Sequence, residues 1–395
     1  MKHTRWLALG IIATAVLFTL TLWFSASVIS PQLREQWSLT TATETWLSAA
    51  VPGGFVIGAF VSAYFGFADR FNTRKLFAYA AFLGGLLNLL LLWVDHAGVG
   101  IAIRVATGMT LAGVYPPAVK LISQWFPKQR GLAVGILIAS LTIGTAMPHV
   151  IAIFFVSLDT RLVLVATSIL AIVAAMGVNY LLKDAPGAGG NAPFSLSQLK
   201  QVFHNKPVML ANYGYFGHMW ELYAMWTWLP AFLTASFMFQ YPDLHPEIVS
   251  LIAFLSIGLA GGGGCILGGF VADRIGISRL TIAAMAVSAF CALTIGFTFG
   301  QSMWVTVILS LLWGISIIAD SAQFSVAVSK FGEKPYVGTA LTFQMCVGFL
   351  VATLSINFLP VFQSFLGWEW VFAVLAIGPI LGILSMLRFQ LYERG

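Results

Sequence analysis

Twelve long apolar runs restrict the fold of this chain more than any other feature of its sequence. A helix needs about 20 apolar residues to cross the hydrocarbon core of a bilayer. Apolar residues make up 59% of the chain and charged residues 9%, against roughly half and a quarter in soluble domains. The sequence therefore predicts an all-α integral membrane protein with twelve transmembrane helices, at residues 6–29, 46–67, 76–94, 98–125, 131–156, 161–182, 209–237, 247–271, 280–299, 303–329, 335–361 and 368–389.

The connection between the sixth and seventh runs divides the predicted helices into two groups of six. It holds the glycine-rich stretch 186–190 together with Lys200, His204 and Lys206, a composition typical of a solvent-exposed linker. We therefore predict three parts, namely an N-terminal six-helix bundle at residues 1–182, a cytoplasmic linker at 183–208 and a C-terminal six-helix bundle at 209–395.

The basic residues are distributed unevenly between the two sides of this predicted bundle. Of the 20 Lys and Arg residues, 16 lie in connections on the side of the N-terminus, two on the opposite side, and two, Arg104 and Lys120, within a span. Cytoplasmic connections carry the excess of basic residues in membrane proteins. We therefore expect both termini in the cytoplasm and the chain in a bacterial inner membrane. The net charge of +6 follows from this topology and indicates no nucleic-acid partner.

A short polar stretch occurs twice, between two apolar runs each time. Its first copy is Phe65-Gly-Phe-Ala-Asp-Arg-Phe-Asn-Thr-Arg-Lys75, and its second is Gly269-Phe-Val-Ala-Asp-Arg-Ile-Gly-Ile-Ser-Arg279. The two aspartates are 204 residues apart, about half the chain, which indicates two six-helix repeats. Asn72 stands where the second copy has Gly276. Asparagine tolerates a left-handed backbone next best after glycine, so we expect the same turn in both copies.

The second copy resembles the signature loop of the major facilitator superfamily, G-x-x-x-D-R/K-x-G-x-x-R/K-R/K, at Gly269, Asp273, Arg274, Gly276 and Arg279. The first copy departs from it at Phe65 and Asn72. The resemblance implies twelve helices in two pseudo-repeats, with the first, fourth, seventh and tenth spans around a central cavity. It also implies that the two loops close the cytoplasmic side, against spans eleven and five of the other half. The implied gating residues are Asp69, Arg70, Arg74, Asp273, Arg274 and Arg279.

Ionisable side chains within the spans are few, and each costs at least ~2.5–3.5 kcal/mol at the centre of a helix. They are Arg104, Lys120, His149, His218, Glu221 and Asp320. Because cations and anions are close to balanced, we expect pairing inside the bundle.

Glu221 and His218 are the first choice for proton coupling, with Asp320 as the alternative. The two residues are three apart on the seventh span, so they share a helix face and can pass a proton. A structural His–Glu hydrogen bond is the simpler alternative. Tyr215 and Trp220 flank them and are typical of an aromatic wall around a substrate.

Two cations and several polar residues on the implied cavity helices complete the predicted substrate site. Arg104 begins an Arg-x-x-x-Gly pattern that resembles a fourth-span motif linked to proton coupling in the family, although it can also be tied to backbone carbonyls. Lys120 is expected either to bind substrate or to extend to the lipid headgroups. Asp320 is expected either to bind substrate or to be the structural partner of Lys120. The full set of predicted substrate-binding residues is Arg104, Tyr115, Lys120, Tyr215, His218, Trp220, Asp320 and Gln323.

These features favour a secondary transporter that moves a small solute, such as a small organic anion, with proton coupling. General features are similar to nitrate/nitrite and cyanate-type porters, but spans two and eight lack the arginines that nitrate porters place there. Proton-driven efflux of amphipathic drugs or metabolites is the alternative, slightly favoured by Gly135, Gly144 and Pro148 in a degenerate antiporter motif. A membrane sensor is a third possibility. No catalytic, nucleotide-binding or metal-ligand motif occurs, so we expect no enzyme activity, cofactor or metal, and a monomer in the lipid bilayer.

Overall fold

The computed structural model describes residues 2–65, 67, 71–126, 130–155, 159, 161–184, 199–333 and 336–394. The chain separates into two compact units, Met1–Phe194 and Ser195–Gly395. This division falls within residues 183–208, where the linker is predicted. The linker's residues 185–198 lie outside the described part, and the short helix α11 spans Leu199–His204 within it.

The N-terminal unit consists of helices, most of which are apolar enough to cross a membrane. The fourth predicted span is divided between α7 and α8 by a turn at residues 112–114. The helices are α1 (Lys2–Leu20), α2 (Ser25–Val28), α3 (Ser30–Trp37), α4 (Thr41–Tyr64), α6 (Thr73–Leu90), α7 (Ala97–Leu111), α8 (Tyr115–Trp125), α9 (Arg130–Phe155) and α10 (Arg161–Leu181), with a 3-10 turn η1 (Leu91–Trp93).

The C-terminal unit repeats this pattern with longer helices. A π-helical segment, η3 (Leu255–Ala260), interrupts the glycine-rich eighth span between α13 and α14. The other elements are α12 (Lys206–Gln240), α13 (Pro246–Phe254), α14 (Gly261–Ile275), α15 (Ile277–Thr294), η4 (Ile295–Thr298), α16 (Met303–Ala319), α17 (Ser321–Phe331), α18 (Val337–Trp370), η5 (Val371–Val374) and α19 (Ile377–Arg394).

Twelve spans account for these helices, as the apolar runs predict. Ten stretches of the described chain are long and apolar enough to cross a membrane. The last of them, Val337–Arg394, contains two spans, because the backbone turns at Gly367 with φ 67°. The shorter apolar helix Thr4–Leu20 supplies the remaining span. The predicted all-α, twelve-helix membrane fold is therefore confirmed.

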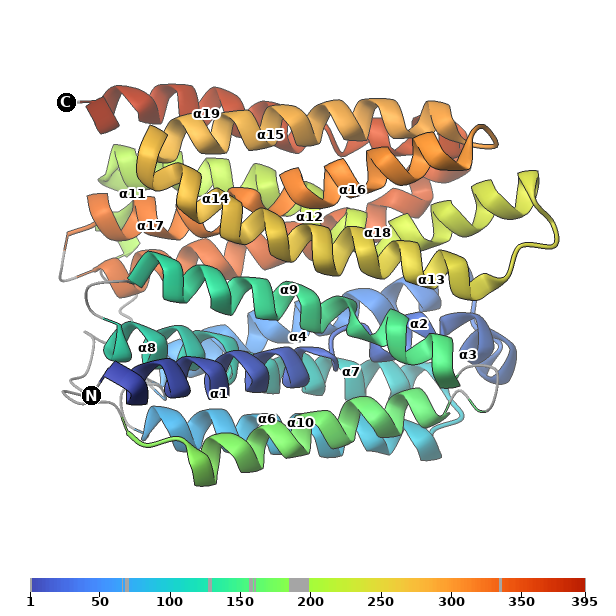
Figure 1. The fold of residues 1–395 in the computed structure, drawn as a ribbon, viewed down its shortest axis with the longest axis horizontal. Coiled ribbons are helices and arrows are strands. Elements are labelled where there is room, and N and C mark those ends of the chain that lie inside the picture. The colour runs from blue at the N-terminus through green and yellow to red at the C-terminus, as the bar shows by residue number, and fades with distance from the viewer. Residues whose placement is uncertain are drawn as a thin grey trace. The chain divides into compact units, whose positions relative to one another are not determined.

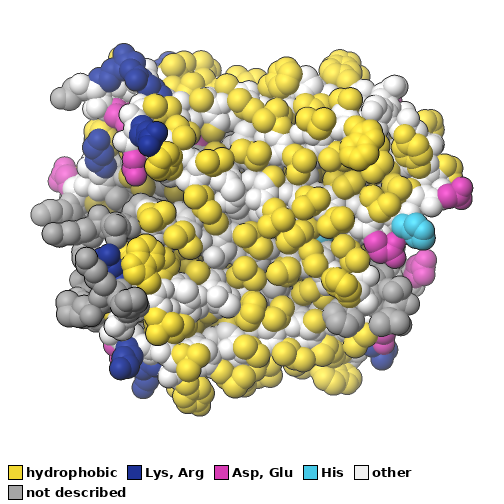
Figure 2. Space-filling view, viewed as in Figure 1, with side chains coloured by type: hydrophobic (Ala, Val, Ile, Leu, Met, Phe, Trp, Pro, Cys, Tyr) yellow, Lys and Arg dark blue, Asp and Glu magenta, His cyan; other side chains and the backbone are white. Residues whose placement is uncertain are grey.

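The two units share an arrangement of their third and sixth spans. Figure 1 shows α6 beside α10 in the N-terminal unit and α15 beside α19 in the C-terminal unit. Hydrophobic side chains cover the middle of the helices on the face drawn in Figure 2, and Lys and Arg gather at one end of each unit. This distribution is the one expected of helices that cross a bilayer.

Two details differ from the sequence prediction. The first span does not continue to residue 29: α1 ends at Leu20, and residues 21–24 form a turn before α2. The prediction that the two polar loops form the same turn is also wrong. Gly276 has φ 95°, whereas Asn72 has φ −58° and is the N-cap of α6, its side chain accepting the Lys75 backbone N–H at 3.1 Å. A capping side chain makes the left-handed conformation unnecessary at Asn72.

Candidate functional site

The break in the first span exposes backbone carbonyls in the interior of the N-terminal unit, and Arg104 binds them. Its side chain, on α7, is completely buried. Nη1 donates a hydrogen bond to the carbonyl oxygen of Leu22 at 2.8 Å, and Nη2 donates to that of Trp23. The turn leaves these carbonyls without helical partners, and an unsatisfied carbonyl is costly in an apolar environment. Arg104 therefore stabilises the break.

Two neutral side-chain oxygen atoms also lie near this guanidinium group. Nη1 also lies 3.1 Å from Ser25 Oγ and 3.4 Å from Asn88 Oδ1. Asn88 is fully buried on α6, and its Nδ2 donates to Ser168 Oγ on α10 at 2.9 Å. Over the described residues, the structure records no ion pair for Arg104. The network joins four spans around a positive charge without a carboxylate partner.

Glu221 lies in a second buried network, in the C-terminal unit. Its side chain, on α12, is 2% exposed. Oε1 accepts hydrogen bonds from Ser288 Oγ on α15 at 2.8 Å and from Trp313 Nε1 on α16 at 2.7 Å. The carboxyl group thus connects three helices, and its two donors come from helices far away in the sequence.

His218 is paired with Asp320, not with Glu221. His218 Nδ1 lies 2.9 Å from Asp320 Oδ1, and both side chains are at most 2% exposed. Asp320 Oδ1 has no hydrogen bond within the described residues, so the two side chains are in close contact without an aligned hydrogen bond. The imidazole packs beside the rings of Tyr215, at 6.0 Å, and Phe324, at 5.5 Å. Asp320 occupies the junction between α16 and α17.

The other predicted substrate residues are distributed over both units. In the N-terminal unit, Tyr115 and Lys120 are half-buried on α8. In the C-terminal unit, Gln323 is buried on α17, and the Trp220 indole donates to the carbonyl oxygen of Val374 at 3.2 Å. In this unit the structure brings Glu221, His218 and Asp320 into one buried region.

The four predicted gating residues that the structure describes lie at the basic end of each unit. Asp69 and Arg70 are outside the described residues. Arg74 Nε donates to Asp184 Oδ1 at 3.0 Å, and its Nη1 donates to the carbonyl oxygen of Asn179. In the second copy, Asp273 and Arg279 are exposed, and the Arg274 guanidinium lies 4.1 Å from the centre of the Phe270 ring.

Asp184 connects the end of α10 to the start of α6. The hydrogen bond from Asn72 Nδ2 at 3.1 Å is the main effect that lowers the pKa of Asp184; burial opposes it, and the hydrogen bond and charge of Arg74 lower this pKa further. In the second unit a different residue makes the corresponding contact. Glu393 on α19 accepts from the backbone N–H groups of Ile277 and Ser278, at 2.8 and 2.9 Å, and caps α15.

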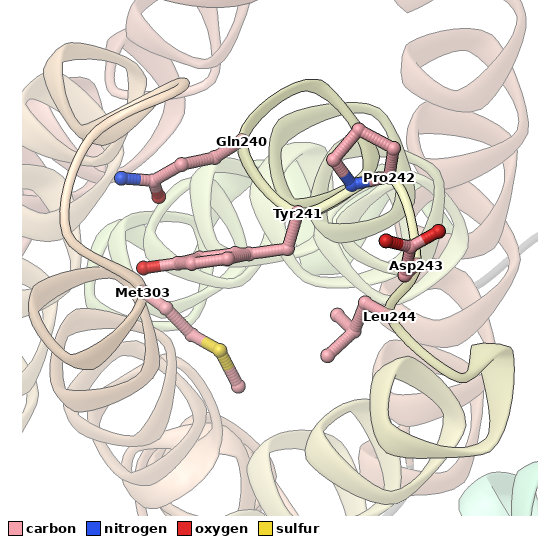
Figure 3. Close-up of a pocket in the computed structure, with 6 residues that line it drawn as sticks. All are labelled: Gln240, Tyr241, Pro242, Asp243, Leu244 and Met303. Carbon is pink, nitrogen blue, oxygen red and sulfur yellow. The ribbon is translucent and has the colours of Figure 1, made fainter.

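An open pocket of about 520 Å³ lies at the far end of α12. Figure 3 shows its six lining residues, one from the end of α12, four from the connection between α12 and α13, and one from the start of α16. They are Gln240, Tyr241, Pro242, Asp243, Leu244 and Met303. The pocket contains none of the buried ionisable residues, so it is a surface hollow separate from the candidate site.

Comparison with protein families decides the classification. The family model of the Major Facilitator Superfamily matches residues 11–356. The chain belongs to this superfamily. Its fold is similar to that of a proton:xylose symporter, XylE, with a TM-score of 0.75, 13% sequence identity, and coverage of 98% of this chain and 96% of XylE.

Two relatives of this superfamily member have names that specify a substrate. A probable sulfoacetate transporter of Cupriavidus necator is 24% identical over 299 residues, which is 69% of this chain and 66% of the relative. A probable L-galactonate transporter of Escherichia coli is 26% identical over 279 residues, 63% of this chain and 60% of the relative. The chain thus matches about two thirds or less of the length of these relatives.

These matches confirm the predicted superfamily, whose members here are transporters and not enzymes. The sequence did not identify Asn88, Ser288 or Trp313 as members of the polar networks. An asparagine inside the apolar run 76–94 was an available signal for Asn88. Serine and tryptophan are ordinary residues in a span, so nothing local marked the other two.

Proposed function

We propose that this superfamily member is a secondary transporter that carries a small organic anion together with a proton, by alternating access. The observation that carries the proposal is the buried Glu221 carboxyl, held by Ser288 and Trp313 near the middle of α12. Counting about 1.5 Å per residue, Glu221 lies about 22 Å from the start of the helix, close to the mid-plane depth at which carriers bind substrates and coupling ions.

The substrate class is supported by the charge of the N-terminal unit and by the relatives. Arg104 and Lys120 are the only Lys or Arg residues that lie away from the ends of the twelve predicted spans. Within the described residues Arg104 has no carboxylate partner, and a buried cation of this kind attracts an anion strongly where the dielectric constant is low. Sulfoacetate and L-galactonate, named for the two relatives, are both organic acids.

The proton is supported by the charge balance of the C-terminal unit. Glu221, Asp320 and His218 are two carboxyl groups and one imidazole in a region that excludes water. An isolated buried charge is costly, so protonation states that give the three side chains no net charge are preferred. With one imidazole for two carboxyl groups, a region without net charge keeps at least one carboxyl group protonated, and Asp320 is the carboxyl group in contact with the imidazole. Glu221 is therefore our first choice for the group that gains and loses the coupled proton.

The test is transport of radiolabelled acids into proteoliposomes with Glu221→Gln. Glutamine keeps an Oε1 acceptor for Ser288 and Trp313, so the fold should be retained. We expect Glu221→Gln to lose accumulation driven by a pH gradient while it keeps substrate exchange, which needs no net proton movement. Ser288→Ala is the matched control, because it removes one hydrogen bond but keeps the carboxyl group. A Glu221→Gln variant that still accumulates substrate would exclude this residue as the coupling site.

Efflux of amphipathic compounds is the second candidate, because α12 carries several packed aromatic rings, among them Tyr215, Tyr223 and Trp226. A counterflow assay with organic anions, amphipathic cations and neutral amphiphiles separates the two. Exchange of the cations alone would favour efflux. Wild-type uptake that ignores an imposed pH gradient would instead favour facilitated diffusion.

We further propose that the two polar loops gate one side of the carrier, that this side is cytoplasmic, and that the protein acts as a monomer in a bacterial inner membrane. The proposed gating residues are Asp69, Arg70, Arg74, Asp273, Arg274 and Arg279. Asp69→Asn should change the labelling of introduced cysteines on the gated side without abolishing substrate binding. Labelling of Lys75→Cys from the periplasm of intact cells would contradict the orientation.

A further inference from the structure

One of the tryptophans in the middle of the C-terminal unit has an unused hydrogen-bond donor. Trp220 Nε1 donates to the Val374 carbonyl, Trp228 Nε1 to the Ile356 carbonyl at 3.1 Å, and Trp313 Nε1 to Glu221. Trp226 is only 1% exposed, yet its Nε1 has no acceptor within the described parts of the chain. An indole N–H can only donate, and nearly all buried donors have an acceptor. The Trp226 donor therefore requires an explanation.

The position of Trp226 fits a substrate contact. It lies five residues after Glu221, about 7.5 Å further along α12, and about 30 Å from the start of a helix of 35 residues. It is therefore close to the depth at which carriers of this architecture bind their substrates.

The surroundings of Trp226 hold the indole ring in place. Its ring packs against Tyr223 at 5.2 Å in an edge-to-face arrangement, and Tyr223 packs against Phe349 on α18 at 5.2 Å. About three helical turns before Trp226 on α12, Tyr215 packs against Gly348 of α18, where an added Cβ would lie 2.3 Å from the Tyr215 ring. A fixed indole presents its N–H in one direction, which suits recognition of a ligand oxygen.

We propose that the Trp226 indole N–H donates a hydrogen bond to an acid-group oxygen of the transported anion and thereby determines specificity. This inference rests on the proposed function. Carboxylate and sulfonate oxygens are strong acceptors that lack hydrogens, so they match a donor-only group, and a hydrogen bond to a charged oxygen is about twice as strong as one to a neutral oxygen. A substrate without an acceptor at this position leaves the donor unsatisfied and is disfavoured.

The experiment compares two variants that remove the indole N–H. One is Trp226→Phe, and the other replaces Trp226 by 3-benzothienylalanine, which keeps the bicyclic shape and lacks the donor. Trp228→Phe is the matched control, because the Trp228 N–H already has a protein acceptor. Counterflow exchange of radiolabelled sulfoacetate and L-galactonate gives the half-saturation concentration, and thermal unfolding without substrate gives stability.

Loss of a hydrogen bond to a charged group corresponds to a rise of about 10- to 100-fold in the half-saturation concentration for both Trp226 variants. The benzothienyl variant should be at least as thermally stable as the wild type, since an unsatisfied donor has been removed. Trp228→Phe should lose stability and keep its half-saturation concentration within about 3-fold, well under the roughly tenfold change of one charged hydrogen bond.

Three results would overturn the inference. Unchanged half-saturation in both Trp226 variants, with a wild type that exchanges the acids, excludes the substrate contact and leaves the proposed function intact. Loss of thermal stability in the benzothienyl variant shows that the donor has an acceptor, such as bound water, in the empty carrier. A wild type that exchanges neither acid, nor any other organic anion of the counterflow panel, rejects the proposed function and the inference with it.

Discussion

Replacing Gly264 by alanine should force two helices of the C-terminal unit apart, whereas the same change at Gly263 should not. A Cβ atom on Gly264 would lie 2.2 Å from the carbonyl oxygen of Ile315 on α16. A Cβ atom on Gly263 would meet nothing within 4 Å. Both residues lie in α14, so the two substitutions differ mainly in what the new methyl group contacts.

The magnitude follows from this difference in contact. Ordinary van der Waals contact begins at 3.4 Å, so α14 and α16 must separate locally by about 1.2 Å in Gly264→Ala. Overpacking of this kind typically costs about 1–3 kcal/mol. The gain in helix propensity, about 1 kcal/mol for alanine over glycine, is common to both variants. Gly264→Ala should therefore be less stable than Gly263→Ala by about 1–3 kcal/mol, and Gly263→Ala should equal or exceed the wild type.

Thermal unfolding of the purified variants in one detergent, at one scan rate, measures the difference. Gly268→Ala provides a second test, because its Cβ atom would lie 2.0 Å from the Ala319 carbonyl oxygen. Equal midpoints for Gly263→Ala and Gly264→Ala would refute the close packing of α14 on α16 in the state that predominates in detergent.

Two further predictions concern the N-terminal unit. Arg104→Lys should lower stability by about 1–3 kcal/mol, because an ammonium group cannot reach the Leu22 and Trp23 carbonyls with a two-armed fork; Arg161→Lys, at an exposed position, is the control for thermal unfolding. Asp184→Asn should cost about 0.2–1 kcal/mol at neutral pH, as expected for an exposed pair. Since the folded pKa of Asp184 is lowered, the wild-type advantage should be complete above the unfolded value of about 3.9 and disappear as the pH falls through the folded value. A difference in stability between the wild type and Asp184→Asn that persists at the lowest pH of acid-unfolding curves would contradict the lowered pKa of Asp184.

The number and order of the spans could be predicted because the length of an apolar run is a local property of the sequence. The break at residues 21–24 could not. No glycine or proline occurs between residues 11 and 30, so the local sequence favours a continuous helix there. The carbonyl groups of the break are satisfied by Arg104, which comes from α7 some 80 residues later. Tertiary contact, not local propensity, determines where α1 ends.

The ionisable members of the candidate site could be named from the cost of a charge in a span, but their partners could not. Helix spacing places His218 and Glu221 on one face, and it favoured a contact between them. The structure gives Glu221 donors from α15 and α16 and gives His218 a carboxylate at the end of α16. Helical spacing describes neighbours within one helix, whereas these partners depend on how α12 packs against others.

The two units differ in the interactions that join the start of the third span to the end of the sixth, so the strength of this contact should differ between them. In the N-terminal unit the contact between the third and sixth spans includes the ion pair of Arg74 with the exposed Asp184 and the hydrogen bond from Arg74 to the Asn179 carbonyl, with Asn72 as the helix cap. In the C-terminal unit Gly276 has no side chain to cap α15, and Glu393 accepts two backbone N–H groups directly. An exposed ion pair contributes about 0.2–1 kcal/mol and is screened by salt, while each hydrogen bond to a charged group contributes about 1.5–3 kcal/mol. Added salt should therefore weaken the contact of α6 with α10 more than the contact of α15 with α19, because the first includes an ion pair with an exposed carboxylate.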